Sequence, residues 1–370
     1  MIIGENGLST LNRETQIIAF LNAHEWGEAV REPVTADASA RRYERLTLNG
    51  KKAVLMDAPF DENDKPCPIG SSAESRRAEG YAALAMLAGS DPSAFVCLAT
   101  ALKRRGFRSP KIIGLNLKSG LMLLEDLGDN LYASVLENAP EREEKMYKKA
   151  VCVLAAIYRS SFDTHIVAHG AEWKIGRYDQ LAYQAEADLF TEWYAPEFDS
   201  ELSEVAQKEW EDIWTDICGH LDEHAFGLAL RDFHAQNIFV LEEADSDITS
   251  VGLIDFQDAL FAHPSFDLVS LLEDARRDVS PDLIAPLISL FCQEAGIQED
   301  AKFHAAYAVQ GAQRNAKILG IFVRLARRDH KQDYLDLIPR VKAHFVRDIS
   351  HPALADLKTW VKKYTPSILE

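Results

Sequence analysis

The chain has 370 residues, 47% of them hydrophobic, and a formal net charge of −18 at pH 7. This length and apolar content allow a sizeable core and favour two lobes over one compact unit. The negative charge opposes binding to nucleic acid or to an anionic membrane surface, because both need clustered Lys and Arg. An acidic surface either attracts a cationic substrate or simply keeps a protein soluble, and the composition leaves both interpretations open.

The cysteines and the apolar stretches indicate a reduced, cytoplasmic environment. The five cysteines are scattered, without a C-x-x-C pair or a cluster with histidine, as is typical of reduced thiols. Residues 1–14 lack a basic start followed by an apolar stretch, and no long apolar run is free of charged residues. We therefore expect a soluble, cytoplasmic protein that does not bind membranes.

The first predicted elements are a helix and a hairpin. Apolar side chains at helical spacing predict a helix over residues 13–26, with Ser9 and Thr10 as capping candidates. Two strands joined by the Asn49-Gly50 turn follow in the run ASARRYERLTLNGKKAVLMDAP. Asn-Gly is the strongest short hairpin signal in this chain.

The chain then alternates between polar loops, helices and strands. Residues 61–75 are rich in turn formers and predict a mobile surface loop. Helical spacing resumes over residues 80–90 and 93–106, where Gly106 is a plausible helix stop. Two further strands are predicted within residues 111–129.

Most of the remaining chain is predicted to be helical. Residues 141–161 have an apolar stripe, and more such helices run from Pro281 to the end. In residues 178–196 a helix would place Glu186 and Trp193 two turns apart on one face.

The segment LRDFHAQNIFVLEE, followed by LIDFQDA, carries the chemistry. Asp232 and Asn237 are separated by four residues between two short apolar runs of strand type, and Asp255 follows a third. Each signal alone is typical of an ordinary turn. Together, at hairpin distance, they have the order of a phosphoryl-transfer centre.

The chemistry accounts for the three residue types. Phosphoryl transfer needs an aligned acceptor hydroxyl and neutralised phosphate charge more than covalent help. Asp232 would accept the proton of the hydroxyl. Asn237 and Asp255 would supply hard oxygen ligands to Mg²⁺ bridging the nucleotide phosphates.

These elements predict an α+β fold of the two-lobed protein-kinase type. Residues 1–126 would form a small antiparallel-sheet lobe over the nucleotide, and residues 127–370 a larger, mostly helical lobe. Glu125 to Leu127 would be the hinge, offering backbone groups to an adenine ring.

The catalytic loop RDFHAQN resembles that of the aminoglycoside phosphotransferase superfamily, since His234 stands where protein kinases have a lysine. More narrowly, the chain resembles the bacterial kinases that phosphorylate the C1 hydroxyl of N-acetylmuramate and N-acetylglucosamine. This resemblance covers roughly residues 15–278 and is carried by DASARRYERL, VLMDAP, LLEDLGD, FTEWYAP, LRDFHAQN and GLIDFQDALFAHPSFDLVSLLEDARRDV.

The resemblance implies ATP, Mg²⁺ and a small-molecule sugar substrate. The product would be a sugar α-1-phosphate, which a nucleotidyltransferase converts into a UDP-sugar during peptidoglycan recycling. By motif, Asp232 would be the base, and Asn237 and Asp255 the metal ligands. Asp267 would brace the catalytic loop, although a carboxylate in the first turn of a helix is also favoured by the helix dipole.

Two departures from the superfamily pattern stand out. Leu230 replaces a histidine before the catalytic Arg-Asp pair, and Met56 or Asp57 lies where kinases place a phosphate-binding lysine. Arg42 or Arg45 would supply the positive charge instead, or would be exposed strand residues. Ser39 and Ala40 are small enough for their backbone amides to approach phosphates.

The acceptor side has several candidates. Arg231, Arg276 and Arg277 are candidates for binding a lactyl carboxylate, although the last two also have acidic neighbours to pair with. Glu186 would bind sugar hydroxyls and Trp193 would stack on the ring. The aromatic stripe around Trp193 is equally compatible with a plain core.

Two other functions remain open. A kinase for an aminoglycoside or amino alcohol suits the acidic charge, but residues 351–370 have mixed signs rather than a dense acidic set. A nucleotide-binding pseudokinase suits the missing lysine, but all three catalytic positions are present.

Overall fold

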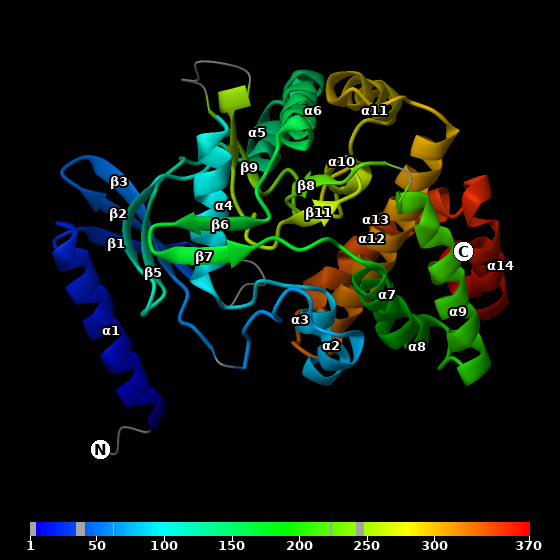
Figure 1. Ribbon diagram of the computed structural model, residues 1–370, viewed down its shortest axis with the longest axis horizontal. Coiled ribbons are helices and arrows are strands. Elements are labelled where there is room, and N and C mark those ends of the chain that lie inside the picture. Colours follow the sequence, from blue (N-terminus) through cyan, green and yellow to red (C-terminus); the bar gives the residue numbers. More distant parts are fainter. Residues whose placement is uncertain (1–4, 35–40, 62, 223, 242–247) are drawn as a thin grey trace.

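A five-stranded antiparallel sheet forms one end of the molecule, and helices form most of the rest (Figure 1). The computed structural model describes residues 5–34, 41–61, 63–222, 224–241 and 248–370. Ser39 and Ala40 lie outside the described residues. The strand order is β1-β2-β3-β5-β4, with bounds β1 (Val30–Val34), β2 (Arg42–Leu48), β3 (Lys51–Asp57), β4 (Ile112–Asn116) and β5 (Leu121–Glu125).

The Asn49-Gly50 turn between β2 and β3 confirms the predicted hairpin. Both turn residues have positive φ, 50° and 77°, as the tight turn of a right-handed hairpin requires. Leu48 pairs with Lys51 directly across the turn. Side chains along the two strands therefore alternate between the faces of the sheet as expected from the sequence.

Helix α1 (Glu5–Ala23) covers one face of this sheet. Ile17, Phe20 and Leu21 pack against apolar side chains of β2, β3 and β5. The helix begins at Glu5, so Ser9 and Thr10, expected to cap it, lie inside it; this prediction was wrong because no proline stops the helix before them.

The opposite face of the sheet packs on α4 (Pro92–Arg104) and, through it, on the main core. Asp91 caps α4 and Pro92 occupies its first turn. The helix ends before Gly106, whose φ of 85° closes the last turn, confirming the predicted stop.

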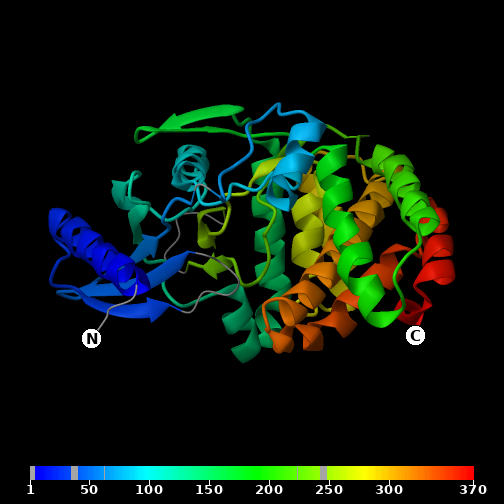
Figure 2. The same cartoon turned by 90° about the horizontal axis from the view of Figure 1, so that it is seen from below.

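Residues 58–61 and 63–91, called the 58–91 segment below, lie between β3 and α4 in sequence, and their helical part packs on the helical lobe (Figures 1 and 2). They contain α2 (Ala73–Glu79) and α3 (Tyr81–Leu84). Arg76 is buried and pairs with Asp179 at 2.5 Å. The helix predicted over residues 80–90 stops at Leu84, because Met86 takes a φ of 55°.

In the described part of the helical lobe, three small two-stranded sheets lie among the helices. Their strands are β6 (His165–Ala168), β7 (Ala171–Lys174), β8 (Gly227–Ala229), β9 (Ile238–Val240), β10 (Val251–Leu253) and β11 (Leu260–Ala262). Strand β6 pairs with β7, β9 with β10 and β8 with β11. The α-helices are α5 (Tyr132–Asn138), α6 (Glu143–Arg159), α7 (Gln180–Leu189), α8 (Ala195–Phe198), α9 (Glu204–Ile217), α10 (Ser265–Leu272), α11 (Pro281–Ala295), α12 (Ala301–Arg327), α13 (Ile338–Asp348) and α14 (Ala355–Tyr364).

Short 3₁₀ and π turns complete the lobe. They are η1 (Pro140–Arg142), η2 (Phe190–Tyr194), η3 (Cys218–Asp222), η4 (Ile248–Ser250), η5 (Gln332–Leu337), η6 (Pro352–Leu354) and η7 (Pro366–Leu369). A second apolar core, separate from the main core, lies within the helical lobe. Helix α12 runs through it and contacts α7, α10 and α13. Within the described ranges, every helix is too short or too polar to span a bilayer.

Candidate functional site

The catalytic loop connects β8 to β9 and is held mainly through its backbone. Asp267, in the first turn of α10, accepts hydrogen bonds from the backbone N–H groups of Leu230 (2.6 Å) and Arg231 (2.8 Å). Asp274 accepts one from Ala235 at 3.2 Å. Burial raises the pKa of Asp267 to about 7, although its two backbone hydrogen bonds act in the opposite direction. Asp267 thus has the contacts of a brace and also the position of a helix N-terminal carboxylate.

The structure brings Asp232, Asn237 and Asp255 together. The Asn237 Nδ2 group donates to the Asp232 carbonyl oxygen at 3.0 Å and lies 3.4 Å from Asp255 Oδ2. His234 lies beneath them, with Nε2 3.3 Å from Asn237 Nδ2, and its burial lowers its pKa. The predicted centre is therefore assembled from one loop and the end of the next hairpin.

Arg231 and Asp255 both adopt left-handed backbone conformations, with φ of 74° and 59°. Non-glycine residues rarely occupy this region, and those that do concentrate at functional sites. Asp255 adopts this conformation two residues after the end of β10. Its carboxylate Oδ1 accepts a hydrogen bond from Gln257 Nε2 at 2.8 Å.

The electrostatics of Asp255 suit a bound cation. Burial raises the pKa of Asp255, and the negative charge of Asp232 raises it further. Within the described ranges, no group of three His, Cys, Asp or Glu side chains holds a metal alone. A magnesium ion here would therefore bind Asn237 and Asp255 and complete its shell with phosphate and water oxygens, as Mg²⁺ commonly does.

The two arginines expected on the nucleotide side have other partners. Arg42 pairs with Asp57 at 2.5 Å, on the sheet face that α1 covers, and Arg13 binds the same carboxylate. Arg45 contacts the hinge instead, pairing with Asp126 at 2.8 Å. The structure does not bring Arg42 to Asp255.

Arg41, which sequence reasoning did not single out, points toward the catalytic centre. Its Nη1 atom lies 4.0 Å from Asp255 Oδ1, and its Nη2 atom donates to Gly89 O at 3.2 Å. The signal was the period of two along a strand, which puts Arg41 and Arg42 on opposite faces. Of the two residues expected at the position of the kinase lysine, Met56 is buried on the face toward α4 and Asp57 lies on the face that α1 covers.

The hinge residues are tied to the neighbouring strands. The Glu125 carboxylate pairs with Arg108 at 2.5 Å and accepts the Lys111 N–H at 3.0 Å, and Arg108 lowers the pKa of Glu125. Leu127 lies against Gly252, because a Cβ atom added to Gly252 would come within 3.1 Å of Leu127 Cδ1. The side chain of Glu125 is therefore engaged within the protein.

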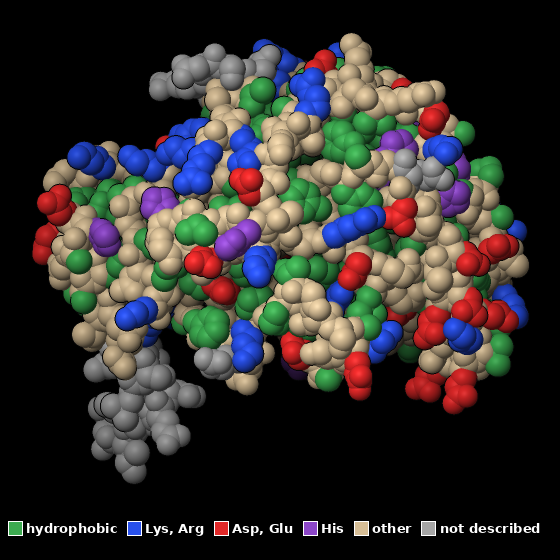
Figure 3. Space-filling model, viewed as in Figure 1, with side chains coloured by type: hydrophobic (Ala, Val, Ile, Leu, Met, Phe, Trp, Pro, Cys, Tyr) green, Lys and Arg blue, Asp and Glu red, His purple; other side chains and the backbone are tan. Residues whose placement is uncertain are grey.

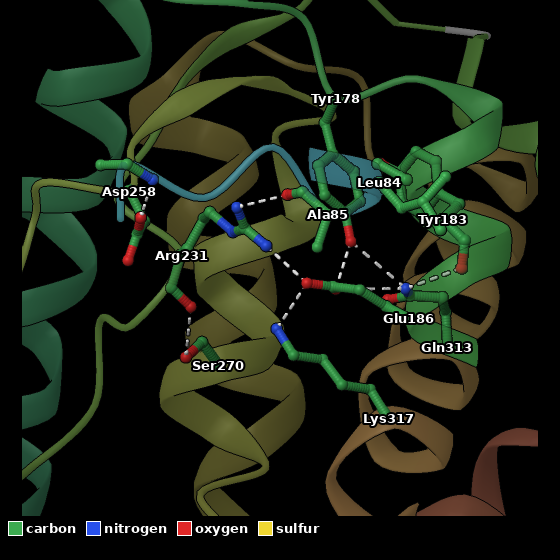
Figure 4. Close-up of polar contacts among 12 residues, drawn as sticks. Leu84, Ala85, Tyr178, Tyr183, Glu186, Arg231, Asp258, Ser270, Gln313 and Lys317 are labelled. Atoms are coloured by element: carbon green, nitrogen blue, oxygen red, sulfur yellow. Dashed lines mark hydrogen bonds and ion pairs between the residues drawn. The ribbon is translucent and has the colours of Figure 1, made fainter. Parts of the chain in front are cut away.

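Glu186 and Arg231, both expected on the acceptor side, contact each other (Figure 4). Arg231 Nη2 lies 2.5 Å from Glu186 Oε1, and Lys317 Nζ lies 2.8 Å from the same oxygen. Tyr178 donates its hydroxyl to Glu186 Oε2, and Gln313 adds a weaker contact. We call these five residues the Arg231–Glu186 cluster.

The cluster is buried and joins three parts of the chain. Its central side chains, those of Arg231 and Glu186, are only 3% and 1% exposed. Burial alone would raise the pKa of Glu186, but Lys317 and Arg231 outweigh it and lower that pKa to about 2. Arg231 Nη1 also donates to Ala85 O at 2.9 Å, which fixes the 58–91 segment to the catalytic loop.

The regular α-helix that was predicted to carry both Glu186 and Trp193 does not reach Trp193. Helix α7 ends at Leu189, and the π turn η2 follows, so the α-helical spacing assumed from the sequence fails there. Trp193 is half-buried against the second apolar core, and Phe190 stacks inside that core. Arg277 pairs with Glu143 at 2.7 Å rather than with a neighbour on its own segment.

This arrangement of a two-lobed fold around a carboxylate, an amide and a second carboxylate is that of a phosphotransferase. The chain belongs to the phosphotransferase enzyme family, whose model matches residues 30–307. It is 39% identical to an N-acetylmuramate/N-acetylglucosamine kinase of Caulobacter vibrioides, covering 96% of this chain and 97% of that protein. A kinase of the same name from Pseudomonas aeruginosa is 27% identical, covering 90% of this chain and 89% of that protein.

Solved structures confirm the predicted fold class. The chain is similar to choline kinase LicA from Streptococcus pneumoniae, with a TM-score of 0.57 and 12% identity over 92% of this chain and 99% of that one. It is also similar to ADP-bound aminoglycoside phosphotransferase APH(2'')-Ib, with a TM-score of 0.52 and 12% identity over 89% of this chain and 98% of that one. At such identities the likeness shows the two-lobed fold alone.

Proposed function

We propose that the protein is an ATP-dependent kinase for the anomeric C1 hydroxyl of N-acetylmuramate, N-acetylglucosamine or both. The observation that carries this proposal is the 39% identity to the Caulobacter vibrioides kinase over 96% of this chain, a span that contains the whole catalytic loop. The geometry of the loop agrees with this activity.

Asp232 is proposed as the base. It is half-buried, so the residue remains partly accessible to an acceptor. Asp267 fixes the backbone just before it through Leu230 and Arg231. A carboxylate held this way can accept the hydroxyl proton as the acceptor oxygen attacks.

Asn237 and Asp255 are proposed as the Mg²⁺ ligands. When bound, the ion neutralises negative charge on the nucleotide phosphates. Arg41, 4.0 Å from Asp255, adds positive charge on the same side. The hinge from Glu125 to Leu127 and the segment with Ser39 and Ala40 remain the proposed nucleotide contacts.

The proposal also places the enzyme in a reaction sequence. Its product would be a sugar 1-phosphate, the substrate of a sugar-1-phosphate nucleotidyltransferase that makes a UDP-sugar in peptidoglycan recycling. Both enzymes would work in the cytoplasm, where ATP is available.

The test measures ATP consumption with Mg²⁺ against N-acetylmuramate, N-acetylglucosamine, kanamycin and choline, with phosphorus NMR of the product. Phosphate coupled to the anomeric proton of either sugar would support the proposal. Turnover only on kanamycin or choline would replace it with a cationic-acceptor kinase. ATP binding without any turnover would indicate the pseudokinase.

A further inference from the structure

Arg324, near the end of α12, forms no side-chain hydrogen bond or ion pair with another described residue. Its guanidinium lies over the Tyr81 ring, with Cζ 5.1 Å from the ring centroid. Its Nε atom is buried without a hydrogen-bond partner among the described residues. The next arginines on this chain differ, because Arg327 and Arg328 pair with Glu197 and Asp329. A buried donor left without an acceptor is costly and calls for an explanation.

Tyr81 connects Arg324 to the catalytic loop. It begins α3 in the 58–91 segment, and four residues later Ala85 O accepts the hydrogen bond from Arg231 Nη1 at 2.9 Å. Arg231 immediately precedes Asp232. The ring over which Arg324 lies therefore belongs to a segment that is hydrogen-bonded to the residue before the proposed base.

Helix α12 provides a second connection. Lys317 and Arg324 are seven residues apart, which is two turns of an α-helix, so they lie on the same face. Lys317 Nζ binds Glu186, and Glu186 binds Arg231. The electrostatics agree: burial and Glu186 raise the pKa of Tyr81, while Arg231 and Arg324 lower it and Asp232 raises it.

Two carboxylates, Asp329 and Glu192, interact electrostatically with Arg324. The hydrogen bond from Arg328 lowers the pKa of Asp329 most, and Arg324 adds a smaller effect. Burial raises the pKa of Glu192, and the charge of Arg324 lowers it by less. The two side chains form no ion pair among the described residues. Figure 3 shows Asp and Glu side chains gathered at the end of the molecule where α9 lies. The net charge of −18 thus does not prevent a local cationic site.

The other arginines considered for an acceptor carboxylate already have partners. Arg231 is paired with Glu186 and is 3% exposed, and Arg277 is paired with Glu143. An arginine fork can bind a carboxylate through two parallel hydrogen bonds, and an aromatic ring under it keeps it in one orientation.

We propose that Arg324, oriented by Tyr81, binds an anionic substituent of the acceptor, namely a carboxylate such as the lactyl group of N-acetylmuramate. This inference rests on the proposed sugar-kinase function. Arg324 would then be a specificity residue, because N-acetylglucosamine has no carboxylate to bind.

The test compares kcat/KM for the two sugars in the wild type, Arg324→Met and Arg324→Lys. For Arg324→Met, loss of a charge-assisted hydrogen-bonded pair should lower kcat/KM for N-acetylmuramate about tenfold to hundredfold relative to N-acetylglucosamine. Arg324→Lys should retain part of the preference, because it keeps the charge but not the fork. Tyr81→Leu should shift the ratio in the same direction by a smaller factor.

Arg327→Met is the matched control, because Arg327 lies on the same helix and pairs with exposed Glu197. It should leave the ratio unchanged. An Arg324→Met ratio equal to that of the wild type would overturn the inference, as would equal losses on both sugars. Measuring the wild type first separates the two levels: if it phosphorylates neither sugar, the proposed function fails and the inference fails with it.

Discussion

The catalytic loop and the Arg231–Glu186 cluster meet at Arg231 but are stabilised in opposite ways. The loop is held by a carboxylate that accepts its backbone N–H groups, and the side chain of Asp255, which follows the neighbouring hairpin, is 42% exposed. In the cluster, side chains from three segments bind one another, and Arg231 and Glu186 are almost completely buried. The groups proposed to react therefore remain accessible to ligands, while the side chains that position them bind one another.

The sharpest test of this division is Asp232→Asn. If Asp232 reacts and does not hold the fold together, kcat should fall by about 10²–10⁴-fold, the usual contribution of a general base. The KM for ATP and the melting temperature should stay close to those of the wild type. Asp282→Asn, an exposed aspartate on α11, is the control. A fall in melting temperature as large as that of a core mutant would contradict the division.

The cluster should respond mainly in stability. Glu186→Gln leaves Arg231 and Lys317 without their anion, and breaking a buried pair typically costs about 3–5 kcal/mol of unfolding free energy. Urea denaturation of Glu186→Gln, Arg231→Met and the double variant would measure this.

The double variant should lose less stability than the two single variants summed, because the second change removes a charge that the first left unpaired. Glu197→Gln, at an exposed ion pair, should cost well under about 1 kcal/mol. Simple additivity of the two cluster variants would show that the pair does not act as a unit.

The same residue gives a pH prediction. The folded-state pKa of Glu186 is about 2, below its ordinary value of 4.5, so its contribution is complete above pH 4.5 and is lost as the pH falls toward 2. That contribution is about 3 kcal/mol, from the pKa difference. Stability curves of the wild type and Glu186→Gln should converge over this pH window. Parallel stability curves from pH 5 to pH 2 would disprove that Glu186 has a lowered pKa in the folded protein.

The smallest expected effect separates two neighbouring arginines. Arg41→Met should raise the KM for ATP about tenfold, the effect of losing one contact worth about 1.4 kcal/mol near the phosphates. Arg42→Met should leave that KM unchanged and slightly lower stability, because Arg42 pairs with Asp57 on the other face. Equal KM values in the two variants would remove Arg41 from the nucleotide side.

Local signals in the sequence predicted much of the fold. The Asn49-Gly50 turn and the Gly106 stop depend only on backbone conformations that few residues allow, so neighbouring residues suffice to predict them. The order of Asp232, Asn237 and Asp255 is equally local, because one loop and one hairpin hold all three.

The remainder depends on contacts between distant segments. To tell whether Arg41 or Arg42 points toward the catalytic centre, one must know which face of the sheet each side chain at the start of β2 lies on. A π turn after Leu189 breaks the helical spacing assumed for Trp193. Lys317 and Arg324 come from α12, far along the chain from Glu186 and Tyr81. No local pattern shows which of many exposed cations would approach the acceptor side.

The hydrogen bond from Arg231 to Ala85 also has a kinetic consequence. The 58–91 segment belongs by sequence to the sheet lobe, yet Arg76, Ala85 and Ala88 attach it to Asp179, Arg231 and Asp258 of the helical lobe. Bending at residues 125–127 would break the hydrogen bond from Arg41 to Gly89 O but leave these contacts with the helical lobe in place. The proposed acceptor side would therefore be assembled before ATP arrives, so the sugar would not need bound nucleotide in order to bind.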